Sequence, residues 1–499
     1  MTEPAPRRCR DDLPFRRIAL VLSGGGALGA YEVGVLRVLE TAALRPSILA
    51  GVSVGAINAV LWLANGFRAV PLERVWLGLR ASTIGMRWIT LLMRALGAAV
   101  MAVAGIQTVL TLMGSPALSP HAIFVHALPE RADAAGAVLD ILAWVLVGLF
   151  GALIVRGSRS SEDWLARFSP PRDPMRLHRI FGVALAAGVI VHVVTWAAGI
   201  PWPHRFSATV LLVGSVVWFA NRPGRAGDRL RRMMLRIAPE TQGRGLWGSE
   251  ARRRLIERIV AGGDPAALTR PDTHLIISAC AIGSGNMCYF VNWPDPAPEF
   301  RERIANAVGQ VVPLATVTEI IEAAVASSAV PAVFEPVRLG GQELVDGGVF
   351  SNQPLHAALA DGADAMVVVL VSPSAGPAHA EREPHLLELG GRLLEIANWR
   401  NLQTELRALP PGWSREPGAS GGAPARVCVV EPEAPLPGGP YGYSTAHSVE
   451  LMRRGSRDAW RALAAAGWLA PGHEPTHETA HEPGGPPPIA PSTRTAPRA

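Results

Sequence analysis

The sequence predicts an α/β protein with a three-layer α/β/α arrangement, in which a mostly parallel sheet is interrupted by an apolar helical insert. Short apolar runs followed by tight turns and helical patterns support the α/β class. These runs are Ile18–Leu22, Ile48–Val52, His274–Ala281 and Ala365–Val371. Runs that are apolar on both faces are typical of parallel strands covered by helices on both sides of the sheet.

The composition indicates contact with lipid rather than nucleic acid. The 499 residues are 49% hydrophobic and only 18% charged, with a net charge of +6. This is too apolar for an ordinary soluble enzyme of this length. No basic run is interleaved with aromatic residues, which argues against a nucleic-acid groove. The four cysteines form no CxxC pair and have no histidine at metal-ligand spacing, so we expect reduced thiols and no metal site.

Four apolar stretches between the second and third of these strand candidates predict membrane spans. They cover residues 88–113, 137–155, 180–200 and 207–220. Arginines crowd the loops before the first stretch, between the second and third, and after the fourth, so the positive-inside rule predicts four spans with both ends cytoplasmic. The fourth is the weakest, because 14 residues rise only about 21 Å against a hydrocarbon core of about 30 Å. Buried or interfacial helices packed on a soluble domain remain the alternative.

These features divide the chain into five parts. An N-terminal arm (1–14) without an apolar signal segment precedes the first half of a catalytic domain (15–80), the insert (81–245), the second half with a C-terminal helix (246–470), and a low-complexity tail expected to be disordered (471–499). We expect a multi-pass protein of a bacterial inner membrane with its catalytic domain in the cytoplasm.

A candidate nucleophile follows the second strand. Gly51, Ser53 and Gly55 form a G-x-S-x-G motif between an apolar strand and an apolar helix, which is the context that a nucleophile elbow requires. The small residues permit a sharp turn that raises the hydroxyl out of the sheet, and the helix N-terminus favours developing negative charge. A glycine-rich turn without chemistry is the alternative.

A glycine-rich turn follows the first strand. Gly24, Gly25 and Gly26 could present backbone N–H groups to an oxyanion. With Gly29 they also satisfy the dinucleotide fingerprint G-x-G-x-x-G, but that motif expects an acidic residue at the end of the next strand, and Ser53 stands there instead. A plain strand-to-helix turn is the third interpretation.

Asp346 is the best candidate for the base. It lies between an apolar strand end and Gly347-Gly348, where an aspartate can point into a cleft and take the serine proton if it is desolvated. An α/β-hydrolase would instead use a histidine after the serine, and His356 and His447 are available. Neither has a glycine-rich turn to hold it near Ser53. Asp-Gly-Gly can also be a simple turn.

Taken together, the ordered motifs resemble the patatin-like phospholipase family. The glycine loop, the G-x-S-x-G elbow, the block from Ala326 to Val337 and Asp346-Gly347-Gly348-Val349 with Asn352 and Pro354 occur in the family's order. The resemblance covers about residues 15 to 80 and 245 to 375. The basic residue that often follows the family's glycine triplet is replaced by Ala27, and Gly348 stands where alanine is frequent.

The resemblance implies a Ser-Asp dyad formed by Ser53 and Asp346, without a histidine. It assigns the oxyanion hole to Gly24, Gly25 and Gly26, with Gly29, Gly51, Gly55, Gly347 and Gly348 as supporting positions. It implies hydrolysis of carboxylic esters of phospholipids or other membrane lipids, with the bilayer as partner and no metal or cofactor. Ser327 and Ser328 match a block expected to pack near the site. A catalytically silent protein that binds or senses lipid is the alternative, and headgroup, acyl position and oligomeric state stay open.

Overall fold

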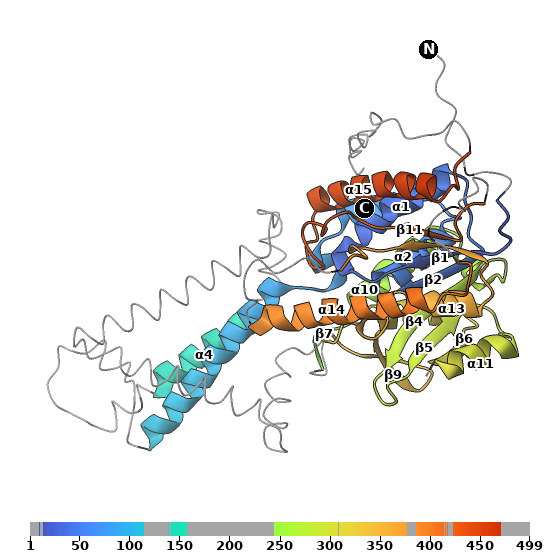
Figure 1. The fold of residues 1–499 in the computed structure, drawn as a ribbon. Helices are drawn as coiled ribbons and strands as arrows, with labels where there is room; N and C mark the ends of the chain where they lie inside the picture. Colours follow the sequence, from blue (N-terminus) through green and yellow to red (C-terminus); the bar gives the residue numbers. More distant parts are fainter. Residues whose placement is uncertain are drawn as a thin grey trace, which may run out of the picture.

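The computed structural model describes residues 13–113, 141–156, 244–307, 309–376, 386–413 and 423–470, together with positions 9, 138, 415 and 417. In this part of the chain, an α/β domain is built on a nine-stranded sheet, and two helices of the insert project away from it (Figure 1).

The centre of the sheet is parallel. Five neighbouring strands pair in the order β11 (Val427–Val430), β10 (Ala365–Val369), β1 (Ile18–Leu22), β2 (Ile48–Val52) and β4 (His274–Ala281). Nearly all of their residues are buried, as expected for strands that are apolar on both faces. The predicted α/β class with a mostly parallel sheet is therefore confirmed.

Beyond β4 the strand directions are mixed. β5 (Met287–Val291) and β9 (Gln342–Asp346) both pair antiparallel with β4. The remaining strands are β6 (Gly309–Pro313) beside β5, β8 (Val337–Leu339) beside β9, and a separate pair of β3 (Gly245–Trp247) with β7 (Ala332–Phe334). The sequence patterns had not predicted these short strands.

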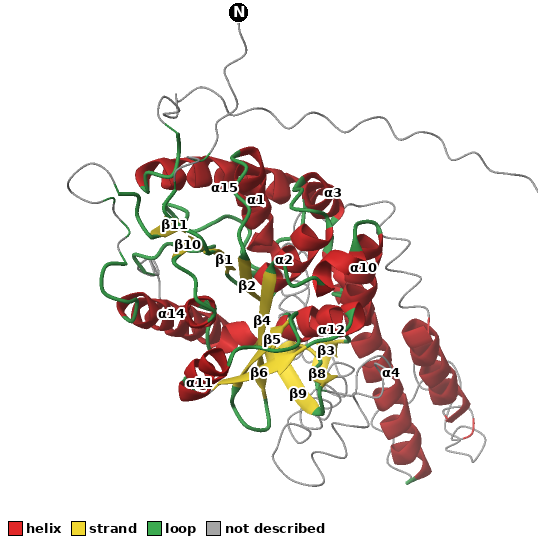
Figure 2. Cartoon of the chain, turned by 90° about the vertical axis from the view of Figure 1, so that its right-hand side faces the viewer, coloured by secondary structure: helices red, strands yellow, loops and turns green. Residues whose placement is uncertain are grey.

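Helices cover both faces of the sheet (Figure 2). Alternate residues of β1 enter two separate cores, with Leu20 and Leu22 on one side and Ala19 and Val21 on the other. The first face carries α1 (Gly29–Thr41), α2 (Val54–Ala64), α3 (Val70–Gly78), α10 (Glu250–Ala261), α12 (Val317–Ser327) and α15 (Thr445–Ala465). The second face carries α11 (Pro298–Asn306), α13 (Leu355–Ala360) and α14 (Leu386–Arg407). The expected three layers are present.

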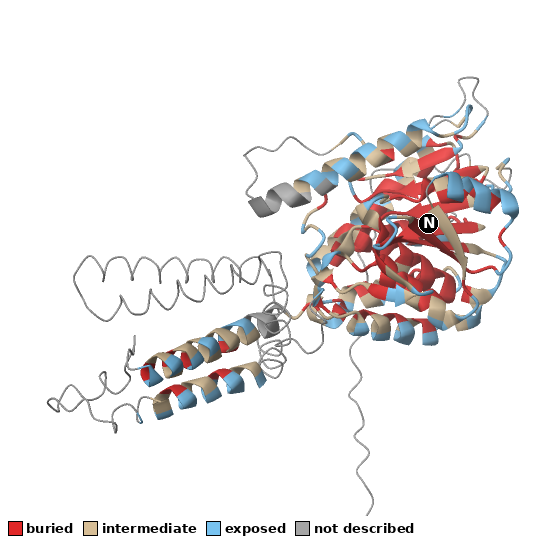
Figure 3. Cartoon of the chain, turned by 90° about the horizontal axis from the view of Figure 1, so that it is seen from below, coloured by how far each residue is buried: buried red, intermediate tan, exposed pale blue. Residues whose placement is uncertain are grey.

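Two helices of the insert lie side by side away from the α/β domain (Figure 3). They are α4 (Trp88–Leu112) and the helix Ile141–Arg156. They pack closely at Gly97 and Gly151, because a Cβ on either glycine would fall 2.6–2.7 Å from the other's carbonyl oxygen. Small residues at a helix crossing are typical of membrane helices.

Among the described residues, one helix is long and apolar enough to cross a membrane, by length and composition alone. It spans Met93–Leu112, and 22% of its most apolar window is buried. The helix Ile141–Arg156 is apolar but shorter. The predicted spans 180–200 and 207–220 lie outside the described residues, as do the tail 471–499 and nearly all of the arm 1–14. The four-span topology stays a prediction.

Candidate active site

Ser53 lies at a sharp turn between β2 and α2. Its backbone has φ 54° and ψ −125°, a strained conformation for a residue with a side chain. The turn requires close backbone contact, because a Cβ at Gly55 would lie 2.5 Å from the carbonyl oxygen of Leu22. Gly51 is equally confined by the backbone of Ala56. The predicted strand, turn and helix around Ser53 are confirmed.

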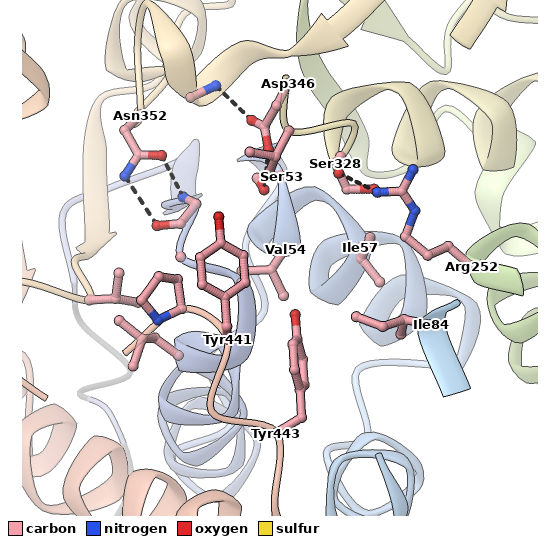
Figure 4. A pocket seen from close by; sticks show the side chains of 18 of the residues that line it. Ser53, Val54, Ile57, Ile84, Arg252, Ser328, Asp346, Asn352, Tyr441 and Tyr443 are labelled. Carbon is pink, nitrogen blue, oxygen red and sulfur yellow. Dashed lines mark hydrogen bonds between the residues drawn. The ribbon is translucent and has the colours of Figure 1, made fainter. Parts of the chain in front are cut away.

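Sheet register brings Asp346 to Ser53. The last residue of β2, Val52, pairs with Ser278 of β4, and the next residue of β4, Ala279, pairs with Asp346 of β9. β2 therefore ends beside the middle of β4, and β9 pairs with β4 from that point onward. The Ser53 hydroxyl donates to Asp346 Oδ2 at 2.6 Å, although 293 residues separate the two (Figure 4).

The Asp346 carboxylate is held in a desolvated position. Its Oδ1 accepts the N–H of Gly348 at 2.8 Å, and the side chain is almost fully buried. Burial raises the pKa of Asp346 to about 6, while the hydrogen bonds from Ser53 and Gly348 and the charge of Arg252 oppose that rise. The carboxylate is therefore more basic than that of an exposed aspartate.

Ser327 fixes the backbone of the turn. Its Oγ accepts the N–H of Ser53 at 2.8 Å and donates to the carbonyl oxygen of Ser278 at 2.7 Å. The N–H of Asp346 donates to Ala329 two residues further along. The end of α12 thus contacts both members of the Ser53–Asp346 pair. Ser327 thus packs beside Ser53 as expected, and its hydroxyl also links the turn after β2 to β4.

The N–H groups of the glycine loop differ in their hydrogen bonding, and Gly24 is the glycine of this loop that packs against Ser53. The N–H of Gly24 already donates to Asn352 Oδ1 at 3.0 Å, and that of Ala27 donates to the carbonyl oxygen of Pro440 at 2.8 Å. Gly25 and Gly26 have no acceptor for their N–H groups among the described residues. Gly26 has φ +58°, and a Cβ there would lie 2.4 Å from Pro440 O. Of the three predicted oxyanion donors, Gly24 is thus already hydrogen-bonded in this structure, and the oxyanion hole itself stays a prediction.

The other predicted glycines also stand at close contacts. A Cβ on Gly29 would meet Val54 and Trp76, and one on Gly347 would meet the carbonyl oxygen of Ser278. A Cβ on Gly348 would lie 2.7 Å from Asn352 Oδ1. These positions allow the glycine loop, the elbow and the Asp-Gly-Gly turn to pack against one another.

A cavity of about 580 Å³ opens from Ser53 and Asp346. We name its two sides, the insert-side arm and the α14-side arm, after the segments that line them. The insert-side arm is lined mostly by apolar side chains, among them Ile57, Leu61, Ile84, Met86, Ile256 and Ile259, and Arg252 lies on the same side of Ser53. The α14-side arm is lined by more polar residues, among them Asn352, Ser372, Glu395, Asn398, Trp399 and Tyr441. Figure 4 shows Ile57 and Ile84 on one side of Ser53 and Asn352 and Tyr441 on the other.

Arg252 is a buried cation that the sequence patterns did not reveal. It comes from α10, is 3% exposed, and donates from Nη1 to the carbonyl oxygen of Ser328 at 2.5 Å. Its guanidinium also lies 3.5 Å from the ring of Phe334. One arginine in an arginine-rich helix gives no local signal of this role.

The two alternative histidine bases do not reach Ser53. His356 lies against the carbonyl oxygen of Arg303, and His447 against that of Gly442. Neither lines the cavity. In the part of the chain described, no three His, Cys, Asp or Glu side chains gather closely enough to hold a metal ion, and the four cysteines are free thiols.

The structure is an α/β fold with a buried, hydrogen-bonded serine and aspartate at the edge of a cavity, and comparison with known families identifies the family. A family model described as patatin-like phospholipase matches residues 20–187 and 216–359. The chain belongs to the patatin-like phospholipase family.

Individual relatives match only short segments. The chain is 47% identical over 57 residues to "Lysophospholipase nte1" of Aspergillus terreus, covering 11% of this chain and 4% of that protein. It is 44% identical over 48 residues to "Neuropathy target esterase sws" of Drosophila melanogaster, covering 10% of this chain and 3% of that protein. The matches therefore span only a few per cent of these relatives.

Among solved structures, VipD from Legionella pneumophila aligns with 93% of this chain and 71% of its own, at 13% identity and a TM-score of 0.33. That score is too low to bear on the fold or the function.

Proposed function

We propose that the chain is a lipid acyl hydrolase that cleaves carboxylic esters of membrane lipids through an acyl-enzyme on Ser53, as a phospholipase A, a lysophospholipase or a lipid esterase. The observation that carries the proposal is the 2.6 Å hydrogen bond from the Ser53 hydroxyl to Asp346, inside a largely apolar cavity. Family membership and the names of the two relatives support the same class of reaction.

In the first half of the reaction, Ser53 Oγ attacks the ester carbon and its proton passes to Asp346 Oδ2. The N–H groups of Gly25 and Gly26 stabilise the negative charge on the carbonyl oxygen. When the tetrahedral intermediate collapses, the proton on Asp346 passes to the leaving alcohol. The acyl group remains on Ser53.

In the second half, a water molecule donates a proton to Asp346 and attacks the acyl carbon. Collapse of this intermediate returns the proton to Ser53 Oγ and releases the fatty acid. A desolvated carboxylate suits this task because its raised pKa makes it a stronger base than an exposed aspartate. Gly24 is a positioning residue in this scheme, since its N–H is held by Asn352.

We further propose that the insert lies in the bilayer, with the α/β domain on the cytoplasmic side. The length and hydropathy of Met93–Leu112 support membrane insertion, and the exposed apolar side chains of the helix Ile141–Arg156 support it as well. An even number of spans is required because Ser53 and Asp346 lie on opposite sides of the insert in sequence.

Hydrolysis of a lipid panel by purified protein tests the proposed activity. Wild type and Ser53→Ala, compared in mixed micelles, should differ by about 10³-fold or more in release of free fatty acid. Equal activity of the two proteins would exclude the serine mechanism. A folded wild type that is inert toward every lipid ester would instead favour the catalytically silent, lipid-binding alternative.

A further inference from the structure

Two tyrosines reach the cavity from a turn outside the segments that the family model matches. The turn covers residues 438–443, between β11 and α15, and we call it the tyrosine turn. The matched segments are residues 20–187 and 216–359. Tyr441 and Tyr443 both line the cavity, and Figure 4 shows their hydroxyl groups directed toward the side where Ser53 lies. The tyrosine turn therefore adds polar groups to the site from a separate part of the chain.

The tyrosine turn is held against the glycine loop. The carbonyl oxygen of Pro440 accepts the N–H of Ala27 at 2.8 Å, and a Cβ on Gly26 would lie 2.4 Å from the same oxygen. Directly after the turn, Ser444 is the N-cap of α15, and its side chain accepts a backbone N–H of that helix at 3.3 Å. The backbone around Tyr441 is thus fixed on both sides, by the glycine loop and by the start of α15.

The Tyr441 hydroxyl is an unused hydrogen-bond donor close to Asp346. It has no hydrogen-bond partner among the described residues. Partial burial and the negative charge of Asp346 raise the pKa of Tyr441, so the hydroxyl stays protonated at neutral pH. Tyr443 differs, because the charge that acts on its hydroxyl is that of Arg252. Only the first of the two tyrosines is therefore coupled to the aspartate.

The proposed reaction places an oxygen atom beside Asp346 in both of its halves. In the first half this is the oxygen of the leaving alcohol, which receives the proton from Asp346. In the second half it is the oxygen of the attacking water, which gives a proton to Asp346. Both oxygens bond to the ester carbon held at Ser53 and exchange a proton with one carboxylate, so they occupy the same position in the cavity. A donor that lines the cavity close to Asp346 is suited to contact that position.

We propose that Tyr441 is a further catalytic residue, whose hydroxyl donates to the leaving alcohol oxygen in the first half and orients the attacking water in the second. This inference rests on the proposed acyl hydrolase function. In the first half, the phenol O–H stabilises negative charge on the alcohol oxygen until the proton arrives from Asp346. In the second half, the water gives one proton to Asp346 and donates its other hydrogen to Tyr441 Oη. Tyr441 itself neither gains nor loses a proton.

The test compares two esters that share an acyl chain and differ in the alcohol. A p-nitrophenolate leaves without a hydrogen-bond donor, whereas an alkoxide does not, so Tyr441→Phe should affect an alkyl ester far more than a p-nitrophenyl ester. For a monoacylglycerol we expect kcat/KM to fall about 10- to 100-fold, as for the loss of a hydrogen bond to a charged group. For the p-nitrophenyl ester it should fall by less than about threefold.

The second half of the reaction gives an independent readout. Slower attack of water on the acyl-enzyme should lower kcat and KM of Tyr441→Phe by the same factor on the p-nitrophenyl ester, and should produce a burst of p-nitrophenol equal to the amount of enzyme. The variant should unfold at the wild-type temperature, because Tyr441 is 44% exposed and its hydroxyl has no partner among the described residues. A purely structural role of Tyr441 would produce neither the dependence on the alcohol nor the burst.

Tyr443→Phe is the matched control, since it removes a hydroxyl from the same turn that is coupled to Arg252 and not to Asp346. It should keep the wild-type ratio of kcat/KM between the two esters. Tyr441→Phe that slows both esters equally, or neither, would overturn the role of Tyr441, as would the same dependence on the alcohol in Tyr443→Phe. Equal hydrolysis of the p-nitrophenyl ester by wild type and Ser53→Ala would instead overturn the proposed function.

Discussion

Asn352 and Gly24 are joined by two hydrogen bonds across 328 residues of sequence. Asn352 Oδ1 accepts the N–H of Gly24 at 3.0 Å, and Asn352 Nδ2 donates to Gly24 O at 3.1 Å. This clamp fixes the glycine loop against the segment that follows Asp346. Gly25 and Gly26, whose N–H groups have no acceptor among the described residues, follow Gly24 directly in this loop.

Removing this clamp should lower catalysis with little change in substrate binding. In Asn352→Ala both Gly24 contacts are lost, and we expect kcat to fall about 10- to 100-fold, as for disturbance of an oxyanion site. KM should change by less than about threefold, because Asn352 acts on the transition state through the loop. Asn306→Ala, at an exposed position on α11, is the control. An equal loss in both variants, or none in Asn352→Ala, would argue against the clamp.

The raised pKa of Asp346 predicts a single acidic limb in the pH profile. Protonation of Asp346 below pH about 6 removes the base, so kcat/KM should fall tenfold per pH unit below that value and be level above it. Hydrolysis of a non-ionising ester between pH 4.5 and 8.5 measures this limb. A plateau that extends to pH 4.5 would show that Asp346 is not the base.

Arg252 should control where that limb lies. Its positive charge lowers the pKa of Asp346, so Arg252→Met should move the limb to higher pH. Arg252→Lys keeps the charge and should move it less. Loss of the bond to Ser328 O should also destabilise the Met variant by about 1–3 kcal/mol, which thermal unfolding at pH 8 detects. An unmoved limb in Arg252→Met would leave Arg252 with a structural role only.

The close crossing of the two insert helices predicts different effects of two glycine substitutions. Gly97→Ala places a methyl group 2.6 Å from Gly151 O and should separate the helices, whereas Gly105→Ala meets nothing within 4 Å. Hydrogen exchange in detergent should rise over residues 141–156 only in the first variant. Gly105→Ala should be neutral or stabilising by up to about 1 kcal/mol, because alanine favours a helix. The same exchange in both variants would refute the crossing.

The local sequence pattern predicts the central strands of the sheet and the turn that holds Ser53. β1, β2, β4 and β10 are continuous apolar runs, and the small residues around Ser53 permit only a tight turn there. The pairing of Ser53 with Asp346 was reached through the order of motifs, because no periodicity relates positions 293 residues apart.

These local patterns do not predict contacts between segments that are distant in sequence. Ser327 and Asn352 belong to motifs of the family resemblance, but their hydrogen bonds depend on how distant segments pack together. Arg252 is unremarkable in its local sequence, and its contact with Ser328 depends on the packing of α10 against the end of α12. The sequence patterns also did not predict α14, because residues Leu386–Arg407 mix polar and apolar side chains without a long apolar face. For the insert, charge distribution predicted an even number of spans, and only its first helices fall within the described residues.

The most direct test of the Ser53–Asp346 mechanism is labelling with an alkyl fluorophosphonate, followed by mass spectrometry of the peptides. We predict a single adduct on Ser53 in wild type, none in Ser53→Ala, and labelling slowed by about 10²-fold or more in Asp346→Asn, because the base is lost while the cavity stays intact. An adduct on another residue, or Asp346→Asn labelled as fast as wild type, would contradict the mechanism.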